Sequence, residues 1–233
     1  MEEQNIITLE VANQFLNDQD SVEIPDYTHI TDDAAAALAK HDGELLDLYS
    51  LLELSDKAAE SLASHRGSGR SHFLELPSVE SLSDHAIAAL ATYPGSLNLK
   101  SLKHISDQAA ESLAKHNEEL KLGVTDLTPA AAKSLAGHSH SLSLALETLP
   151  AEIAQILAEK KGSLIFSELE ELSDEAAAAL SKHVGYLGLG GVTSLSESAL
   201  EALKNHKTPL NLYGLVHAEM LTMDEWQVLD KGR

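Results

Sequence analysis

The stretch ISDQAAESLAKH at residues 105–116 returns as LSDKAAESLASH at 54–65 and as LSDEAAAALSKH at 172–183. Each copy starts with an apolar residue, and equivalent residues recur along the chain every 22–28 positions. These starting residues are Ile7, Ile30, Leu54, Leu82, Ile105, Leu127, Leu149, Leu172, Leu195 and Leu221. Such a sustained period predicts one supersecondary unit, repeated about ten times and stacked as a solenoid.

The first half of each unit alternates between apolar and polar residues. In one copy Leu97 and Leu99 flank Asn98. Alternation at period two over so short a run predicts a strand of about three or four residues with one buried face. We expect nine such strands, the first at 22–24 and the last at 210–212.

The second half of each unit has the period of an α-helix. In the quoted copy its apolar stripe is formed by Ile105, Ala109, Ala110 and Leu113. Ser106 is expected to cap this helix, because its hydroxyl can accept a hydrogen bond from the first turn, where the charge of Asp107 is also favourable. In another copy Thr128 takes the capping place and Pro129 the first helical position, which proline tolerates well.

Strand and helix alternate too closely for separate sheets, which predicts parallel strands on the inside and helices on the outside. Neighbouring strands lie about 4.8 Å apart, whereas packed helices need about 8–10 Å, so the stack should curve. The predicted fold is therefore an α/β right-handed solenoid with the shape of a horseshoe.

We expect one solenoid domain over the whole chain, 1–233. Its expected parts are an N-terminal helical cap at 1–20, central repeats at 21–206 and a C-terminal capping repeat at 207–233. Trp226 lies in the last repeat and is expected to cover the exposed end of the core.

The sequence LNLKSLKHISDQAAESLAKH at 97–116 resembles the leucine-rich repeat, and most closely its cysteine-containing subtype from F-box substrate receptors. Leu or Val fills the cysteine positions here, and Ala-Ala replaces the usual Gly-Leu at the helix start. We expect no F-box ahead of Ile7. The resemblance implies a curved solenoid used for protein recognition, and no role in ubiquitin ligation follows from it.

Composition narrows the class of partner. The chain has 37 acidic and 16 basic residues, a formal net charge of −21, and no cysteine. This charge repels phosphate backbones and anionic lipids, so we expect neither nucleic acid nor membrane as a partner.

There is no apolar run long enough to span a bilayer and no signal-peptide pattern at the start. We therefore expect a cytoplasmic protein, and we also expect it to be a monomer.

Histidine recurs where each predicted helix ends, with Tyr93 and Lys160 at the same place in two copies. The six histidines are His41, His65, His116, His138, His183 and His206. A metal ladder is one interpretation, but equivalent side chains on neighbouring helices should lie about 8–10 Å apart, too far to share an ion. We favour a structural role in which each side chain covers the last helical carbonyls.

No catalytic motif stands out from the repeats. The glycine cluster GYLGLGGV at 185–192 lacks the third glycine of a dinucleotide-binding loop and predicts a tight turn. His138 and His140 are two residues apart, but a third metal ligand is not evident. We therefore expect no enzyme activity, no cofactor and no metal.

The candidate binding face lies on the concave side of the strands, where residues vary while the leucines repeat. Its expected members are Glu23, Asp47, Tyr49, Glu75, Asn98, Lys100, Lys121, Asn211 and Tyr213. A longer repeat adds a basic insertion loop with Arg66, Arg70 and His72.

We expect this face to bind another protein without catalysis. The alternatives are a structural spacer array within a larger polypeptide and, less favoured, a metal- or carbohydrate-binding module. Protonation of the 12 histidines would remove part of the negative charge, so affinity for a basic partner could weaken below about pH 6.5.

Overall fold

The computed structural model describes residues 5–41, 45–66, 73–218 and 220–230. The chain divides into two compact units, Met1–Leu122 (unit 1) and Gly123–Arg233 (unit 2). Each unit alternates short parallel strands with helices, which confirms the predicted repeat of strand and helix. No helix of the described residues is long and apolar enough to cross a membrane.

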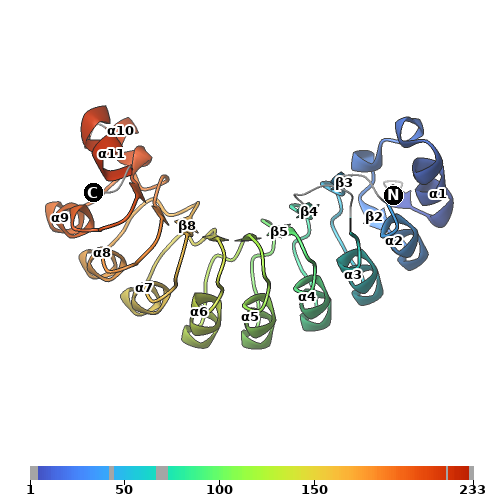
Figure 1. Cartoon of the computed structure of the whole chain (residues 1–233), viewed down its shortest axis with the longest axis horizontal. Helices are drawn as coiled ribbons and strands as arrows, with labels where there is room; N and C mark the ends of the chain where they lie inside the picture. The colour runs from blue at the N-terminus through green and yellow to red at the C-terminus, as the bar shows by residue number, and fades with distance from the viewer. Residues whose placement is uncertain (1–4, 42–44, 67–72, 219, 231–233) are drawn as a thin grey trace. The chain divides into compact units, whose positions relative to one another are not determined.

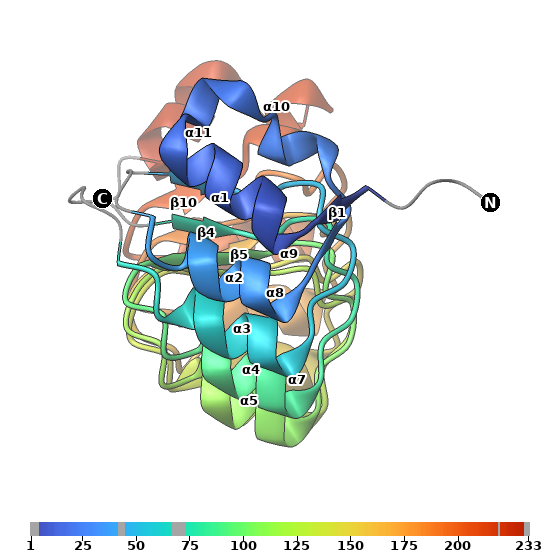
Figure 2. The ribbon, with the colours of Figure 1, turned by 90° about the vertical axis from the view of Figure 1, so that its right-hand side faces the viewer.

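Unit 1 contains four strands that pair in parallel and in chain order: β3 (Leu45–Asp47), β4 (Phe73–Glu75), β5 (Ser96–Leu99) and β6 (Leu120–Leu122). Its α-helices are α1 (Leu9–Asn17), α2 (Asp32–Leu38), α3 (Asp56–Ala63), α4 (Asp84–Leu90) and α5 (Asp107–Leu113). Helices α2 to α5 lie side by side along one side of the strands (Figures 1 and 2). A separate parallel pair, β1 (Ile6–Ile7) and β2 (His29–Ile30), leads into α1 and α2.

Unit 2 repeats the arrangement with β7 (Leu142–Leu144), β8 (Leu164–Phe166), β9 (Leu187–Gly188) and β10 (Leu210–Asn211), again parallel and in order. Its helices are α6 (Pro129–Ala136), α7 (Ala151–Leu157), α8 (Asp174–Leu180), α9 (Glu197–Lys204), α10 (Tyr213–His217) and α11 (Met223–Asp230). The last two helices follow β10 and end the described chain.

The core follows the two predicted periods. Leu74, Leu97 and Leu120 are buried in consecutive strands of unit 1, while the next residue in each strand, Glu75, Asn98 or Lys121, is at least partly exposed. Ala109 and Ala110 of α5 are also fully buried, and such small side chains let neighbouring helices approach closely. Leucine therefore fills the layer between sheet and helices, and alanine fills the space between helices.

The predicted helix caps are confirmed, and the structure adds a contact between repeats. Ser106 Oγ accepts from the amide of Ala109 at 2.9 Å and donates to Asp84 Oδ1 of the preceding repeat at 2.7 Å. Equivalent bonds join Ser55 to Asp32, Ser83 to Asp56 and Ser196 to Asp174. We call this series the Ser–Asp ladder. It explains why serine and aspartate recur together in the repeat.

The first predicted strand, at 22–24, is wrong. The chain there forms two 3₁₀ turns, η1 (Gln19–Ser21) and η2 (Ile24–Asp26). Asp18 caps the first by accepting from the amide of Asp20 at 3.2 Å, and Pro25 has no amide hydrogen to give to a sheet. Ile24 is still buried, so its apolar character was interpreted correctly but the backbone geometry was not.

The C-terminal repeat begins and ends differently from the others. Tyr213, expected in the column beside the strands, starts α10. Thr222 and Glu225 form a reciprocal capping box at the start of α11, with Thr222 N to Glu225 Oε2 at 2.9 Å and Glu225 N to Thr222 Oγ1 at 3.3 Å. Trp226 of α11 packs its ring edge-on against Tyr213, with ring centroids 5.3 Å apart.

Candidate binding face

The outward face of the unit 1 sheet brings four of the predicted site residues into one row. The strand register places Asp47 beside Glu75, Glu75 beside Asn98, and Asn98 beside Lys121. The row runs from acidic through neutral to basic across about 14 Å, since neighbouring strands lie about 4.8 Å apart. We call the surface formed by Asp47, Glu75, Asn98 and Lys121 the unit 1 face.

Hydrogen bonds orient the side chains of this row. Asn98 Nδ2 donates to Glu75 Oε2 at 2.5 Å, and Asn98 Oδ1 accepts from the amide of Lys100 at 3.1 Å. At the other end Lys121 Nζ lies 3.5 Å from Glu119 Oε1, and both side chains are partly exposed. These two hydrogen bonds hold the Asn98 side chain in place. Asn98 uses only the Oε2 atom of Glu75, and not its Oε1 atom.

The polar residue at the end of a strand also shapes the turn that follows. Asp47 Oδ1 accepts from the amide of Tyr49 at 3.2 Å, as Asn98 does from Lys100 and as Asn211 does from Tyr213 at 2.8 Å. Asp and Asn are favoured in such turns because a short side chain reaches the amide two residues on. These positions were predicted for binding alone, and the structure gives them a second, structural role.

Aromatic side chains border the unit 1 face. Tyr49 is 44% exposed just after β3, and Phe73 is 37% exposed at the start of β4. A shallow groove crosses β4, β5 and β6, and it is lined by Phe73, Glu75, Ser96, Leu97, Asn98, Glu119 and Lys121. The groove therefore combines an exposed ring with carboxylates and one amine.

The equivalent row in unit 2 is smaller and nearly uncharged. Ser143, Ile165, Gly188 and Asn211 lie side by side in the register. A Cβ on Gly188 would stand 3.1 Å from two carbons of Ile165, so glycine makes room for that side chain. Asn211 Oδ1 also accepts from Trp226 Nε1 at 3.3 Å. Asn211 and Tyr213 therefore both contact Trp226 of α11. Both residues are also partly exposed to solvent.

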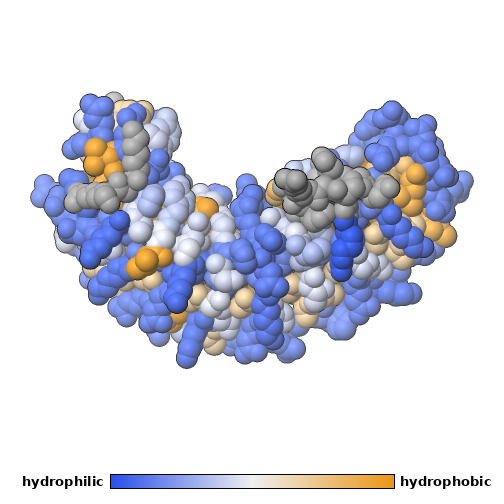
Figure 3. Space-filling model, in the orientation of Figure 1, coloured by the Kyte–Doolittle hydropathy of each residue, from blue (hydrophilic) through white to orange (hydrophobic). Residues whose placement is uncertain are grey.

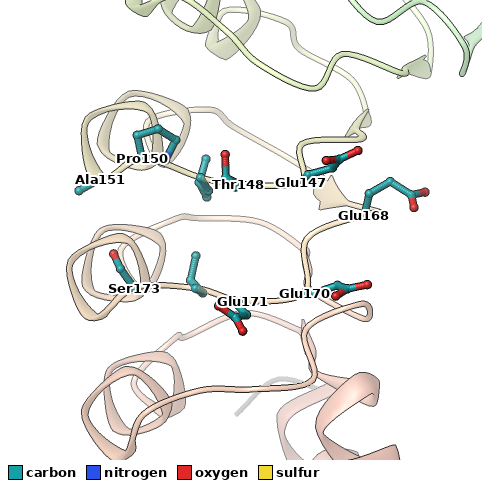
Figure 4. A pocket seen from close by; sticks show the side chains of 10 residues that line it. Glu147, Thr148, Pro150, Ala151, Glu168, Glu170, Glu171 and Ser173 are labelled. Carbon is teal, nitrogen blue, oxygen red and sulfur yellow. The ribbon is translucent and has the colours of Figure 1, made fainter.

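A second surface of unit 2 is strongly acidic. A groove of about 810 Å³ runs from the loops after β7 and β8 toward the starts of α7 and α8. Figure 4 shows Glu147, Glu168 and Glu170 at the strand side and Pro150 and Ser173 at the helix side, with Glu171 between. All four glutamates are exposed. Among the described residues none of them forms an ion pair, so we call this surface the acidic groove.

The remaining predicted residues are dispersed. Glu23 is exposed at the start of η2, outside the strand register, because the expected strand does not form. Arg66 donates from Nη1 to the carbonyls of Ala63 and His65, both at 3.0 Å, and so covers the end of α3. Arg70 and His72 lie outside the described residues.

The helix-end side chains form a buried column in each unit. In unit 1 these are His41, His65, Tyr93 and His116, and in unit 2 they are His138, Lys160, His183 and His206. His116 Nδ1 lies 3.2 Å from the carbonyl oxygen of Ala91, which ends the preceding helix α4. The predicted contact with helix-end carbonyls is therefore found, but with the neighbouring helix.

The expected 8–10 Å between these side chains is too large. The rings of His41 and His65 have centroids 6.0 Å apart, and those of His183 and His206 are 6.1 Å apart. These ring separations are shorter than the usual spacing of about 8–10 Å between packed helices. The described residues contain no group of three or more His, Asp or Glu side chains that could hold a metal ion.

Lys160 is the main departure within the column. It is 1% exposed, and its Nζ donates to the carbonyl oxygens of His140 and Lys161, both at 2.7 Å. Burial lowers the pKa of this amine to about 8. In unit 1 burial raises the pKa of the Tyr93 hydroxyl to about 12. Both groups occupy positions where other repeats place an imidazole.

Sequence reasoning missed Phe73 and the acidic groove. Phe73 precedes Glu75 by two positions, so period-two alternation already places both on the same face. The acidic run at 168–171 was a visible signal in the sequence for the groove. The acidic groove lies near the starts of α7 and α8 because of the path of the loops that follow β7 and β8. Amino-acid composition does not predict this path.

Comparison with known protein families finds no family model that matches the chain, and no curated protein has a significantly similar sequence.

Proposed function

We propose that the protein is a non-catalytic scaffold that binds a basic segment of another protein on the unit 1 face. The observation that carries this proposal is the in-register row from Asp47 to Lys121, bordered by the exposed rings of Tyr49 and Phe73. Binding surfaces combine aromatic anchors with oriented polar groups, and the leucines beneath provide a rigid support.

The charges along the row suggest an orientation for the bound segment. A Lys or Arg side chain of the partner would lie over Asp47 and Glu75, next to Tyr49, where a carboxylate pair and a π-face both favour a cation. An acidic or carbonyl group of the partner would meet Lys121. The net charge of −21 would speed the approach of such a basic partner through long-range attraction.

The same proposal includes the finer features expected from the sequence. These are about ten repeats in a curved, horseshoe-shaped solenoid similar to the leucine-rich repeat, acting as a cytoplasmic monomer. The family resemblance supports recognition of a protein, since that is what such solenoids do. Parallel strands that alternate with helices in both units support the repeat.

The test is a pair of variants with the same change in charge at two surfaces. D47K/E75K reverses the acidic end of the unit 1 face, and E147K/E170K reverses two residues of the acidic groove. Partners captured from native lysate by the wild type and by both variants are compared by quantitative mass spectrometry. We expect D47K/E75K to lose at least about 90% of the specific partner, and E147K/E170K to retain it.

A second variant, Y49A/F73A, removes the exposed rings without changing the charge and should also weaken capture. Circular dichroism must show that each variant is folded. Loss of capture by E147K/E170K with retention by D47K/E75K would place the binding surface in the acidic groove and contradict the proposal. Equal capture by all variants would contradict it as well.

A further inference from the structure

We propose that the buried column of unit 2 is an acid-sensitive element, in which protonation of His183 and His206 loosens the ends of α8 and α9. Neither the sheet face nor a partner is involved, so the inference is independent of the proposed function. It rests on the burial of both rings, on the atoms that surround them and on the neighbouring amine of Lys160.

His183 is enclosed by the preceding repeat. It is 2% exposed, its Nε2 lies 2.9 Å from the carbonyl oxygen of Gly162, and its Nδ1 lies 3.4 Å from that of Ala158. A neutral ring can donate to only one of these oxygens, and the shorter distance favours Nε2 as the donor. The ring therefore bonds to the turn after α7 and lies near the end of that helix.

His206 continues the column one repeat later. It is 4% exposed, and its Nδ1 lies 2.8 Å from the carbonyl oxygen of Thr208. The Thr208 hydroxyl donates to the carbonyl of Gly185 at 2.6 Å. The two imidazoles are nearly parallel, with ring centroids 6.1 Å apart and planes inclined by 21°. Movement of either ring would disturb the turns that follow α8 and α9.

The charges that face these rings are positive or absent. The ammonium of Lys160 lies in the same column on the α7 side, and each imidazole is the neighbour of the other. Among the described residues no carboxylate pairs with either ring. A second and third positive charge in this buried column would therefore lack compensation, which makes protonation unfavourable in the folded state.

The direction of the pKa changes agrees with this geometry. Burial is the largest cause that lowers the pKa of His183, with smaller contributions from His206 and Lys160, while its two carbonyl contacts act in the opposite direction. Burial also lowers the pKa of His206, against the effect of hydrogen bonds to the backbone of Thr208 and His183. Both rings are therefore harder to protonate in the folded protein than in the unfolded chain.

The sign of the effect follows from proton linkage. An imidazole whose pKa is lower in the folded than in the unfolded state binds protons more readily when the chain unfolds. Its neutral form stabilises the fold fully above the unfolded pKa of about 6.5. That stability decreases as the pH falls through 6.5 toward the lower folded value. Mild acid should therefore weaken the ends of α8 and α9.

The experiment is hydrogen exchange with mass spectrometry at pH 7.5 and 5.5, with rates corrected for intrinsic chemical exchange. We expect segments 174–188 and 197–212 to lose protection at pH 5.5 in the wild type by up to about 10-fold for each imidazole, because pH 5.5 lies about one unit below the unfolded pKa of about 6.5. H183Q/H206Q replaces both rings with amides that do not titrate, and should show a smaller loss. H85Q removes the exposed histidine paired with Glu60 and should behave like the wild type.

Protection of these segments that is equal at both pH values in the wild type overturns the proposal. So does an undiminished acid response in folded H183Q/H206Q. If that variant does not fold, NMR titration of the wild-type imidazole resonances decides. Measured pKa values of His183 and His206 below about 6.5 support the proposal, and measured pKa values at or above about 6.5 contradict it.

Discussion

At the scale of single residues, Gly185 is a position where a side chain would clash directly with the backbone. Its φ of +148° lies in the region that favours glycine, and a Cβ there would stand 2.0 Å from the carbonyl oxygen of Gly162. The clash involves backbone on both sides, so no side chain can move to relieve it. The glycine therefore sets how closely two successive turns of unit 2 approach.

We expect Gly185→Ala to lower the free energy of unfolding by about 3 kcal/mol or more, because backbone strain and a steric clash add together. Urea denaturation at pH 7.5 measures this change. Gly190→Ala is the matched control, since a Cβ there would meet only the Asn211 side chain at 3.4 Å, an ordinary contact. Equal stability of the two variants would show that the turn can rearrange.

At the scale of helices and strands, the Ser–Asp ladder makes the starts of α3, α4, α5 and α9 depend on the preceding helix. Ser106 satisfies an amide of its own helix and also binds Asp84 at the start of the preceding helix α4. Asp84 in turn lies in the first turn of α4, where its charge is favourable. One carboxylate thus serves two successive repeats.

We expect Ser106→Ala to destabilise the protein by about 1–2 kcal/mol, through loss of the cap and of the bond to Asp84. Ser112→Ala is the control, because Ser112 lies within the same helix and its hydroxyl donates to the Gln108 carbonyl at 3.1 Å. That change should alter stability by no more than about 0.5 kcal/mol. Thermal and urea unfolding compare the variants.

A double-mutant cycle separates the two roles of Ser106. If the bond between repeats contributes, Asp84→Ala and Ser106→Ala together should destabilise by less than the sum of the two single changes, with a coupling of about 0.5–1.5 kcal/mol. Additive effects would indicate that Ser106 acts only as a helix cap.

The elements were predictable where local chemistry and packing agree. Ser106 and Thr128 cap helices as expected, since hydroxyl caps and apolar stripes favour the same boundaries. The region 22–24 was mistaken for a strand because Ile24 is buried in a turn as it would be in a strand. The start of α10 at Tyr213 was missed because that helix begins without a side-chain cap.

The buried column could be located from the sequence but its environment could not. Recurrence placed histidine at each helix end, yet residue type alone favours an exposed position for a polar side chain. Burial follows because the carbonyl ends of the preceding helix and its turn supply acceptors, as Ala158 and Gly162 do for His183. These acceptors belong to residues 21–25 positions earlier, which no local pattern identifies.

At the scale of the whole molecule, the net charge of −21 is the dominant electrostatic feature. Acidic side chains occupy the helix starts in both units, where they serve the Ser–Asp ladder. On the face shown in Figure 3, hydrophobic residues appear as a few separate patches. Met223 and Val228 of α11 are among the exposed hydrophobic residues. The excess of acidic over basic residues means that the carboxylates repel one another.

We expect salt to stabilise the protein, because screening weakens this repulsion more than it weakens the few exposed ion pairs. The melting temperature should rise by about 2–5 °C between 10 and 150 mM NaCl at pH 7.5, which corresponds to roughly 1 kcal/mol. Differential scanning calorimetry measures it. A decrease would indicate that ion pairs outweigh repulsion.

The candidate face was only partly predictable at this scale. Asp47, Glu75, Asn98 and Lys121 were placed in one row by periodicity alone, and the register agrees. Their turn contacts were not foreseen, because the amide two residues on becomes available only when the chain turns there. Glu23 failed with its strand, and Asn211 is engaged by Trp226, which lies in a helix that the repeat pattern does not specify.

The Ser–Asp ladder also has a consequence for how the chain can change in length. Donor and acceptor lie one repeat apart, so excision of 83–105 would bring Ser106 to the place of Ser83, opposite Asp56. The new junction would have the same chemistry as the old one. Duplication or deletion of whole units that carry the serine and aspartate pair therefore creates no unmatched boundary in this part of the chain.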